Sequence, residues 1–233
     1  IDGAEGSNAP ISPNRNRILL LGILLGLALP SVGCLMVLFL DTRVQSRKDI
    51  EKALSVPFLG EIPADKDMIR RSKKNARAIF KQDDDSILSE AFRVLRTNMS
   101  FMSKKDDPAQ VITFTSFNVG AGKTFISYNL AMSFVYAKKR VVLVDLDIRK
   151  ASLSHLVGAH KTGVSNYLAD STLRVDDIIQ HMEHFDVVAA GAIAPNPAEL
   201  LMDERLDALM AELRARYDVI IVDSVPLGIV ADA

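Results

Sequence analysis

The chain is most apolar near its beginning. Residues 18–40 carry no charged side chain, and 18 of these 23 residues are apolar. A helix of this length is about 34 Å long, enough to cross the roughly 30 Å hydrocarbon core of a bilayer. A helix buried in a soluble core is the alternative, but the length of the segment and its lack of charge disfavour it. The pattern therefore predicts one transmembrane helix over residues 18–40.

The segments on either side of this helix differ in composition. Residues 1–17 are rich in Pro, Gly, Ser and Asn and are predicted to approach the membrane in an extended form. Residues 41–81 form a charged juxtamembrane linker, with a short predicted helix at 49–54. Basic residues are more frequent after the apolar segment than before it, so the positive-inside rule places the C-terminal side in the cytoplasm. Residues 1–17 are then expected to be extracytoplasmic.

Residues 82–233 are predicted to form the globular domain, because two kinds of apolar pattern alternate along them. Apolar residues at helical spacing indicate helices, and short apolar, β-branched runs indicate buried strands. The predicted helices cover 87–103, 124–137 and 197–216, and the predicted strands cover 111–115, 141–145, 185–189 and 218–223. Buried strands that alternate with helices are typical of a parallel sheet covered on both faces. The predicted fold class is α/β, preceded by one transmembrane helix.

Composition and charge narrow the classes of function. The 233 residues carry 28 basic and 29 acidic side chains, and this net charge of −1 argues against a generally basic nucleic-acid binder. A single cysteine excludes a disulfide framework and a cysteine-based zinc site. Several lysines and arginines gather between residues 66 and 81. This basic run is interpreted either as a surface that rests on anionic lipid or as a solvated face, and both interpretations stay open.

A glycine-rich stretch lies between the predicted strand at 111–115 and the helix that follows it. Residues 120–124 read GAGKT, the form of a phosphate-binding loop whose backbone N–H groups close on phosphate oxygens at a helix N-terminus. Lys123 is predicted to reach the β- and γ-phosphates of a nucleotide, and the Thr124 hydroxyl is predicted to bind Mg²⁺. The common pattern G-x-x-x-x-G-K-[ST] is broken at one position, because Phe117 stands where that pattern has glycine.

Three aspartates lie at the ends of two predicted strands. Asp145 and Asp147 come at the end of the strand 141–145, and Asp223 ends the strand 218–223. The carboxyl ends of parallel strands face the phosphates in a P-loop sheet, so we expect the three carboxylates to converge there. Mg²⁺ uses few protein carboxylates, which leaves one of the three available as a base. A helix cap or a turn is the structural alternative for any single one of them.

These motifs carry a family resemblance. Residues 15–233 resemble the bacterial tyrosine kinases (BY-kinases) that are fused to polysaccharide co-polymerase (chain-length determinant) membrane domains. Residues 115–124 look like the Walker A motif of that family. Residues 141–149 (VVLVDLDIR) look like its Walker A′ motif, and residues 219–226 (VIIVDSVP) look like its Walker B motif.

Further matches lie outside the three Walker motifs. Glu90, Arg93 and Arg96 match the E-x-x-R-x-x-R oligomerisation motif of the family, and their spacing predicts that they lie on one side of a helix, which suits ion pairing across a subunit contact. An exposed helix face without partners is the alternative. Residues 59–63 (LGEIP) and 195–201 (PNPAELL) also match family segments.

The resemblance implies a P-loop NTPase fold and ATP-dependent phosphoryl transfer to tyrosine hydroxyls. Lys123, Asp145 and Asp147 are the implied catalytic residues, with Lys123 neutralising phosphate charge and Asp145 accepting the tyrosine proton. Mg²⁺ is implied to be bound or positioned by Thr124, Asp147 and Asp223. The implied nucleotide contacts are Val119, Gly120, Ala121, Gly122, Lys123, Thr124 and Phe125.

The resemblance also implies a location and partners. It implies an anchor in the inner (cytoplasmic) membrane, a kinase domain in the cytoplasm, and a role in the biosynthesis and export of capsular or exopolysaccharide. The implied partners are further copies of the chain in a homo-oligomeric ring, tyrosine-containing protein substrates, a cognate phosphatase, the polysaccharide export machinery and membrane lipid. Nucleic acid is not among them.

The sequence departs from the family pattern in four respects. Val119 and Val225 stand where the family often has proline. The tyrosine-rich tail of the family is not found, since the four tyrosines are scattered along the chain. The chain continues for ten residues after Asp223, where a P-loop sheet normally has further strands and helices. A C-terminally incomplete kinase domain is therefore expected.

Two other functions fit parts of the pattern. Partner-switching ATPases of the ParA/MinD type resemble the chain in all three Walker motifs. Their signature lysine would fall at position 118, where this chain has Asn118, and they lack a membrane span directly before the domain. A non-catalytic regulator of polysaccharide chain length is the second alternative, because the membrane segment suits that role as well.

Overall fold

The computed structural model describes residues 14–41, 44, 47–64, 86–102, 110–194 and 197–226. The chain divides into two compact units, Ile1–Phe58 and Leu59–Ala233, which are described separately. The basic run between residues 66 and 81 and most of the predicted extended segment 1–17 lie outside the described residues, as does the predicted boundary at residue 82.

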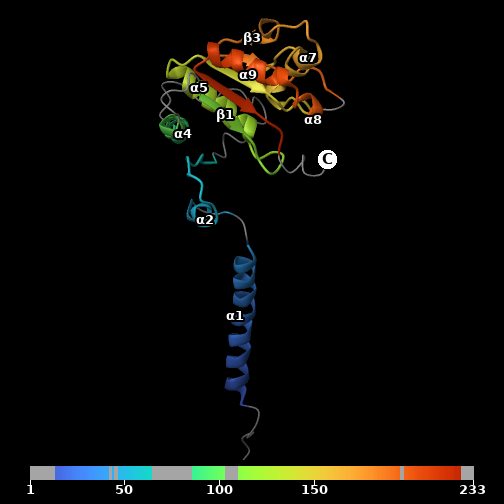
Figure 1. Ribbon diagram of the computed structural model, residues 1–233. Coiled ribbons are helices and arrows are strands. Elements are labelled where there is room, and N and C mark those ends of the chain that lie inside the picture. The colour runs from blue at the N-terminus through green and yellow to red at the C-terminus, as the bar shows by residue number, and fades with distance from the viewer. Residues whose placement is uncertain are drawn as a thin grey trace, which may run out of the picture. The chain divides into compact units, whose positions relative to one another are not determined.

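The first unit contains the apolar helix α1 (Arg15–Leu40), which Figure 1 shows as one continuous rod. The side chain of Asn14 caps its start by accepting a hydrogen bond from the Asn16 N–H at 3.2 Å. Within the part of the chain that the structure describes, α1 is the one helix long and apolar enough to be a candidate membrane span. It begins three residues before the predicted span and ends at the same residue.

A short helix follows in the same unit. Helix α2 (Arg47–Ala53) agrees with the prediction at 49–54 apart from its ends. Arg47 forms an ion pair with Glu51 one turn later, at 2.6 Å, and its guanidinium lies 5.1 Å from the centre of the Phe58 ring. The ion pair is exposed and local, so it stabilises this helix by only a few tenths of a kcal/mol, roughly.

The second unit is built on a five-stranded sheet with the order β1-β5-β2-β4-β3. Its strands are β1 (Gln110–Phe114), β2 (Val141–Asp145), β3 (Ile179–His181), β4 (Asp186–Val188) and β5 (Val219–Asp223). The pairs β1–β5, β5–β2 and β2–β4 are parallel. The predicted parallel sheet is confirmed for these four strands, with β2 and β5 at its centre.

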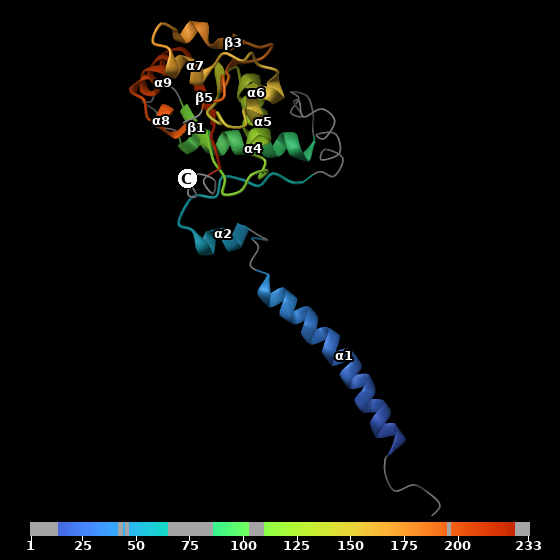
Figure 2. The ribbon, with the colours of Figure 1, turned by 90° about the vertical axis from the view of Figure 1, so that its right-hand side faces the viewer.

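Helices cover both faces of the sheet. One layer holds α4 (Ile87–Met102), α5 (Lys123–Tyr136) and α6 (Ser152–Val157), and the other holds α7 (Val164–Ala169), the 3-10 turn η1 (Val175–Asp177), α8 (Pro197–Leu200) and α9 (Glu204–Arg216). Figure 2 separates α4, α5 and α6 on one side of the strands from α7, α8 and α9 on the other. This is the doubly covered arrangement expected for buried parallel strands.

Alternation along the central strands divides the core in two. Leu143 and Ile221 pack among the residues of α4 and α5, whereas Val142 and Ile220 pack among those of α7 and α9. All four side chains are fully buried. Burial of an aliphatic side chain of this size contributes about 1.5–3 kcal/mol, so the apolar runs of β2 and β5 hold both layers to the sheet.

Two predictions about the elements were wrong in detail. The sheet is mixed, because β3 pairs antiparallel with β4 at its edge, and a three-residue strand is too short to show a pattern in sequence. The helix predicted over 197–216 is two helices. The first ends at Leu200, and Asp203 caps the second, since its carboxylate accepts a hydrogen bond from the Arg205 N–H at 2.8 Å.

The start of α7 lies unusually close to the end of β4. The Val164 N–H donates to the Ala189 carbonyl at 2.8 Å, and the Ser165 N–H donates to the Ala190 carbonyl at 2.9 Å. A Cβ placed on Gly163 would lie 2.0 Å from the Ala189 oxygen. The two backbones can therefore meet only because residue 163 has no side chain.

The family-like segment 59–63 belongs to the second unit and packs on α4. The Asn98 side-chain amide donates to the Leu59 carbonyl at 2.7 Å, and Leu59 and Ile62 pack against the core on the α4 side. This segment therefore packs along one side of α4, although it precedes that helix in the chain.

Candidate functional site

The glycine-rich loop connects β1 to α5, as predicted. Gly120 and Gly122 have φ values of +80° and +91°, a backbone region that favours glycine. Gly122 is the N-cap of α5, and no side chain caps the helix there. The first N–H groups of α5 thus lack a capping side chain at the end where the helix dipole favours an anion. Phe117, at the position where glycine was expected, is exposed and leaves this backbone arrangement intact.

The first two side chains of α5 point in directions that suit a nucleotide. The Lys123 ammonium group donates to the Ser116 hydroxyl at 3.3 Å, which holds it over the loop. The Thr124 hydroxyl donates to one oxygen of Asp223 at 2.6 Å. The loop that follows β1 is thereby tied to the end of β5, 99 residues later in the chain.

The ends of β2 and β5 meet as the sequence predicted. The two strands are parallel neighbours, and Asp145 and Asp223 are partners in their register. Asp223 is 1% exposed, and its second oxygen, Oδ1, has no hydrogen-bond partner among the residues that the structure describes. Burial, aided by the negative charge of Asp147, raises the pKa of Asp223, while Thr124 and Lys123 oppose the rise.

Asp145 is equally buried, but both of its carboxylate oxygens accept hydrogen bonds from the protein. One oxygen accepts from the Asp147 N–H at 3.0 Å, and the other accepts from the Ser154 N–H at 2.8 Å and the Ser154 hydroxyl at 2.7 Å. Burial raises the pKa of Asp145 to about 6 even though these hydrogen bonds lower it. Its exposed fraction is 0%. The carboxylate fixes the loop between β2 and α6 and has no face toward solvent.

Asp147 is buried slightly less than Asp145 and Asp223. It is 6% exposed, and one of its oxygens accepts from the Lys150 N–H at 3.1 Å. Its charge acts on Asp223, so the two carboxylates face the same region. The neighbouring Arg149 and Lys150 are exposed.

The site fits a magnesium ion better than a transition metal. Within the described residues, no group of three or more His, Cys, Asp or Glu side chains comes together as a metal cluster. Mg²⁺ is usually held by one or two carboxylates, water and substrate phosphates rather than by an all-protein cage. The Thr124 hydroxyl and the unpaired Asp223 oxygen are hard oxygen donors of the right kind, and the unpaired atom is a reason to expect a cation beside it.

The three predicted oligomerisation residues make different contacts. Glu90 and Arg93 form an ion pair of 3.2 Å on the outer side of α4. Arg96 instead donates to the Ser133 carbonyl of α5 at 2.5 Å. The three residues span about 120° around the helix, so they still share one side of it, with Arg96 at the edge that packs on α5. A role in a subunit contact stays a prediction.

Sequence reasoning missed Ser154. Its hydroxyl donates to Asp145 and accepts from the Ala190 N–H at 2.9 Å, so it joins the end of β2 to the segment after β4. A serine in a short helix carries no signal that marks such a role. Arg96 did have a signal, because it falls with Phe92, Leu95 and Met99 at the i, i+3, i+4, i+7 spacing of a buried stripe.

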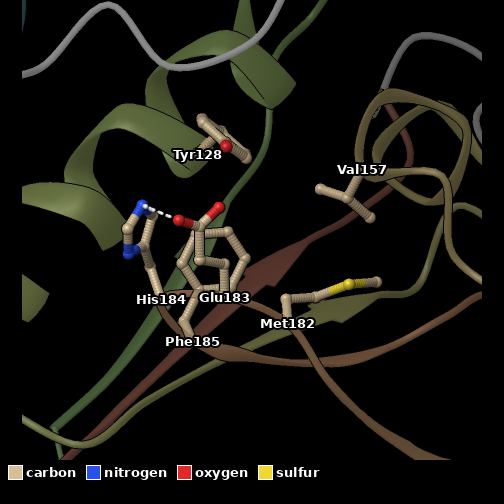
Figure 3. Close-up of a pocket in the computed structure, with 6 residues that line it drawn as sticks. All are labelled: Tyr128, Val157, Met182, Glu183, His184 and Phe185. Atoms are coloured by element: carbon tan, nitrogen blue, oxygen red, sulfur yellow. Dashed lines mark ion pairs between the residues drawn. The ribbon is translucent and has the colours of Figure 1, made fainter.

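A separate cavity of about 220 Å³ lies away from the loop. It is lined by Tyr128, Val157, Met182, Glu183, His184 and Phe185. Figure 3 shows the Glu183–His184 pair at one side and the Tyr128 ring above Phe185, whose centroids are 5.4 Å apart. None of its lining residues belongs to the three Walker-like motifs, so this cavity is not where the nucleotide is expected.

Comparison with known proteins agrees with this geometry. A family model described as an AAA domain matches residues 109–232. Over the whole chain, the sequence is 30% identical to the tyrosine-protein kinase Wzc of Salmonella typhi and 28% identical to the tyrosine-protein kinase Etk of Escherichia coli. The chain covers 34% of each of these relatives, and so spans about a third of the curated proteins it matches.

Solved structures of kinase domains match this chain over most of the length of both proteins. The BceF tyrosine kinase domain is 31% identical with a TM-score of 0.70, over 81% of this chain and 79% of that one. The kinase domain of Escherichia coli Etk is 29% identical with a TM-score of 0.71, over 82% and 76%. Sequence identity and shared fold thus coincide over most of a kinase domain, with the three Walker-like motifs at one edge of the sheet. The chain belongs to the bacterial tyrosine kinase (BY-kinase) family.

Proposed function

We propose that the chain is the membrane-anchoring and kinase portion of a protein that transfers the γ-phosphoryl group of ATP to tyrosine hydroxyls. On this proposal it serves the regulation of capsular or exopolysaccharide biosynthesis and export, the setting of the relatives whose kinase domains it matches. Helix α1 would anchor it in the inner membrane, with the second unit in the cytoplasm. Proteins with tyrosine acceptors, a cognate phosphatase and the export machinery would be its partners.

One observation carries the proposal. The Thr124 hydroxyl lies 2.6 Å from an Asp223 oxygen, and the other oxygen of that buried carboxylate is unpaired. A buried polar atom without a partner costs free energy, roughly 1–3 kcal/mol. That cost is offset when a magnesium ion and a nucleotide occupy the region beside it. The uncapped start of α5 lies at the same edge of the sheet and suits the phosphates.

Each residue of the site has a part in this proposal. The loop Val119–Phe125 would bind the phosphates through its backbone, with Lys123 neutralising their charge. Thr124 and Asp223 would hold Mg²⁺, and Asp147 would position it through water. The bound ion would neutralise charge that develops on the phosphoryl group.

Asp145 can accept the tyrosine proton only under a condition. Both of its oxygens accept hydrogen bonds within the protein, and the side chain is buried. A general base must come within hydrogen-bond reach of the proton it takes. Proton transfer to Asp145 therefore requires that the Ser154 contacts open. Otherwise its role is to hold Asp147 in place.

The direct test is phosphotyrosine formation by the detergent-purified protein with ATP and Mg²⁺. A tyrosine-containing acceptor peptide has to be added, because Tyr167 and Tyr217 are buried and Tyr128 and Tyr136 are half-buried. We expect phosphotyrosine on the peptide, and loss of the product in Lys123→Met. Lys161→Met, a change at an exposed cation outside the three Walker-like motifs, is the matched control for loss of charge.

Other outcomes separate the alternatives. Hydrolysis of ATP without phosphotyrosine on any acceptor would contradict the kinase proposal and favour a partner-switching ATPase. Nucleotide binding with neither hydrolysis nor transfer would favour a non-catalytic chain-length regulator. Asp145→Asn and Ser154→Ala, compared in the same assay, separate the two roles of Asp145. A base is lost in Asp145→Asn alone, whereas a holding role is weakened by both changes.

A further inference from the structure

Helix α5 has different requirements at its two ends. Its N-terminal end carries Lys123 and Thr124 and is suited to an anion. At its C-terminal end, the last carbonyl groups have no partners within the helix and the dipole favours a cation. The last turn of α5 contains no basic residue of its own. Lys138 and Lys139 follow the helix directly but are exposed, so a positive charge on the face of α5 that packs against α4 has to come from α4.

Arg96 of α4 supplies that charge. Its guanidinium donates to the Ser133 carbonyl at 2.5 Å and to the Ser133 hydroxyl at 3.2 Å. Ser133 is fully buried and lies in the last turn of α5. The Ser133 hydroxyl in turn donates to the Phe92 carbonyl of α4 at 3.4 Å. The two helices are thus joined by polar contacts in both directions at this point.

A second contact joins the same helices near the other end of α5. The ring of Phe92, which is fully buried, lies 6.1 Å from the ring of Phe125 at an angle of 59°. Phe125 directly follows Thr124 in the first turn of α5. Helix α4 therefore touches α5 beside the phosphate-binding residues and again at its last turn. Two contacts on one rigid helix fix both its position and its direction.

We propose that Arg96 is a positioning residue that anchors α5 on α4 and so places Lys123 and Thr124 for nucleotide binding. Within the E-x-x-R-x-x-R motif, the surface role then falls to Glu90 and Arg93. The Glu90 side chain is 62% exposed and pairs with Arg93 on the outer side of α4. This inference rests on the proposed nucleotide site, and it divides the motif into an outer pair and an inner anchor.

The test compares Arg96→Met with the matched variant Arg93→Met in the full chain, in detergent micelles. Fluorescent ADP is titrated with Mg²⁺ at a protein concentration at which sedimentation shows a monomer. Loss of a charged hydrogen bond is worth about tenfold in an equilibrium constant, so we expect the nucleotide Kd of Arg96→Met to rise by up to about tenfold. Arg93→Met is expected to leave that Kd unchanged and to weaken self-association measured at higher concentration.

Arg96→Lys keeps a donor and a positive charge but not the geometry of the guanidinium, so it is expected to raise the nucleotide Kd less than Arg96→Met does and to leave it above the wild-type value. If Arg96→Met does not fold, Arg96→Lys and Ser133→Ala are compared instead. Arg96→Lys retains the positive charge, and Ser133→Ala retains the backbone carbonyl that accepts from Arg96. In that case a Kd above the wild-type value in either variant supports the proposal, and wild-type values in both overturn it.

Two results with folded Arg96→Met overturn the proposal as well. One is a wild-type Kd with weakened self-association, which would return Arg96 to the subunit contact. The other is a lowered melting temperature with a wild-type Kd, which would make the contact structural only. The readout is nucleotide binding, so failure to find phosphotyrosine would contradict the proposed kinase function and leave this inference standing.

Discussion

The ends of β2 and β5 lie side by side in the sheet and carry the same side chain, yet the two carboxylates have opposite surroundings. Asp145 accepts three hydrogen bonds from the protein. Asp223 accepts one, from Thr124, and keeps an oxygen without a partner. Both are buried, so burial does not distinguish them.

The difference lies in what supplies the hydrogen-bond partners of each carboxylate. A buried carboxylate that the protein satisfies serves the fold, because it ties the elements that donate to it. A buried carboxylate that the protein leaves unsatisfied costs free energy until a ligand arrives. We therefore propose that Asp145 mainly holds the loop and that Asp223 serves the ligand, and the predictions that follow test that division.

Asp223→Asn should have the largest effect on function. The amide cannot supply the negative charge that a magnesium ion needs, and a bound metal contributes several kcal/mol to phosphoryl transfer, so we expect a loss of roughly 100-fold or more. The measurement is the rate of phosphotyrosine formation together with the Mg²⁺ dependence of nucleotide binding. An unchanged Mg²⁺ dependence would contradict the assignment of Asp223 to the ion.

Removal of the metal sharpens the same prediction. With excess EDTA and no nucleotide, Asp223→Asn is expected to be at least as stable as the wild type, because the wild-type carboxylate is then buried without a full set of partners. The free energy of urea unfolding of both proteins, measured with and without Mg²⁺ and ADP, checks this. A variant that is much less stable under both conditions would make Asp223 a structural residue.

Asp145→Asn should change how stability depends on pH. The pKa of Asp145 rises from 3.8 to about 6 in the folded protein, so between these values the native state binds more protons than the unfolded state. Stability contributed by this group is then present below pH 4 and is lost as the pH rises to 6, by up to about 3 kcal/mol. The asparagine variant lacks this loss. Urea unfolding in EDTA at several pH values, for both proteins, measures the difference between the two curves, and parallel curves would contradict the shift.

Ser154→Ala should act on the fold through Asp145. It removes one donor to the carboxylate and leaves the Ala190 N–H without its acceptor. A buried group left unpaired costs about 1–3 kcal/mol, so we expect a loss of roughly 2 kcal/mol in the free energy of unfolding. The same change made in Asp145→Asn should cost less, because the two residues share the contact. Equal costs in both backgrounds would show that they act independently.

Thr124→Ser should have the smallest effect. Serine keeps the hydroxyl that donates to Asp223 and loses only a methyl group, worth about 0.8 kcal/mol. Nucleotide affinity is expected to stay within about fourfold of the wild type. Thr124→Val, which has the same shape without the hydroxyl, should behave like Asp223→Asn in its Mg²⁺ dependence. If serine and valine behave alike, the hydroxyl does not bind the ion.

Much of the central sheet could be predicted from sequence. The runs at β2 and β5 are apolar at every position up to their final aspartate, and such runs form only where both faces are covered. The P-loop pattern predicted that their carboxyl ends face the phosphates, but it did not predict that the two strands are neighbours. The antiparallel strand β3 could not be predicted, because its three residues gain their form from pairing with β4.

The hydrogen-bond partners of each carboxylate could not be predicted from the sequence. Asp145 and Asp223 both end apolar strands and look alike in the pattern, and what separates them is Ser154, which belongs to a different element. The direction of Arg96 was different, since its spacing with Phe92 and Met99 already indicated the core side of α4.

The close approach at Gly163 limits how this protein can evolve. At 28–32% identity, about two positions in three have changed between this chain and its relatives. Position 163 has no such freedom, because even the methyl group of alanine would overlap the Ala189 oxygen. We therefore expect glycine at this position in every relative that keeps the same junction of α7 with β4. A lineage that replaces it must first have rebuilt that junction.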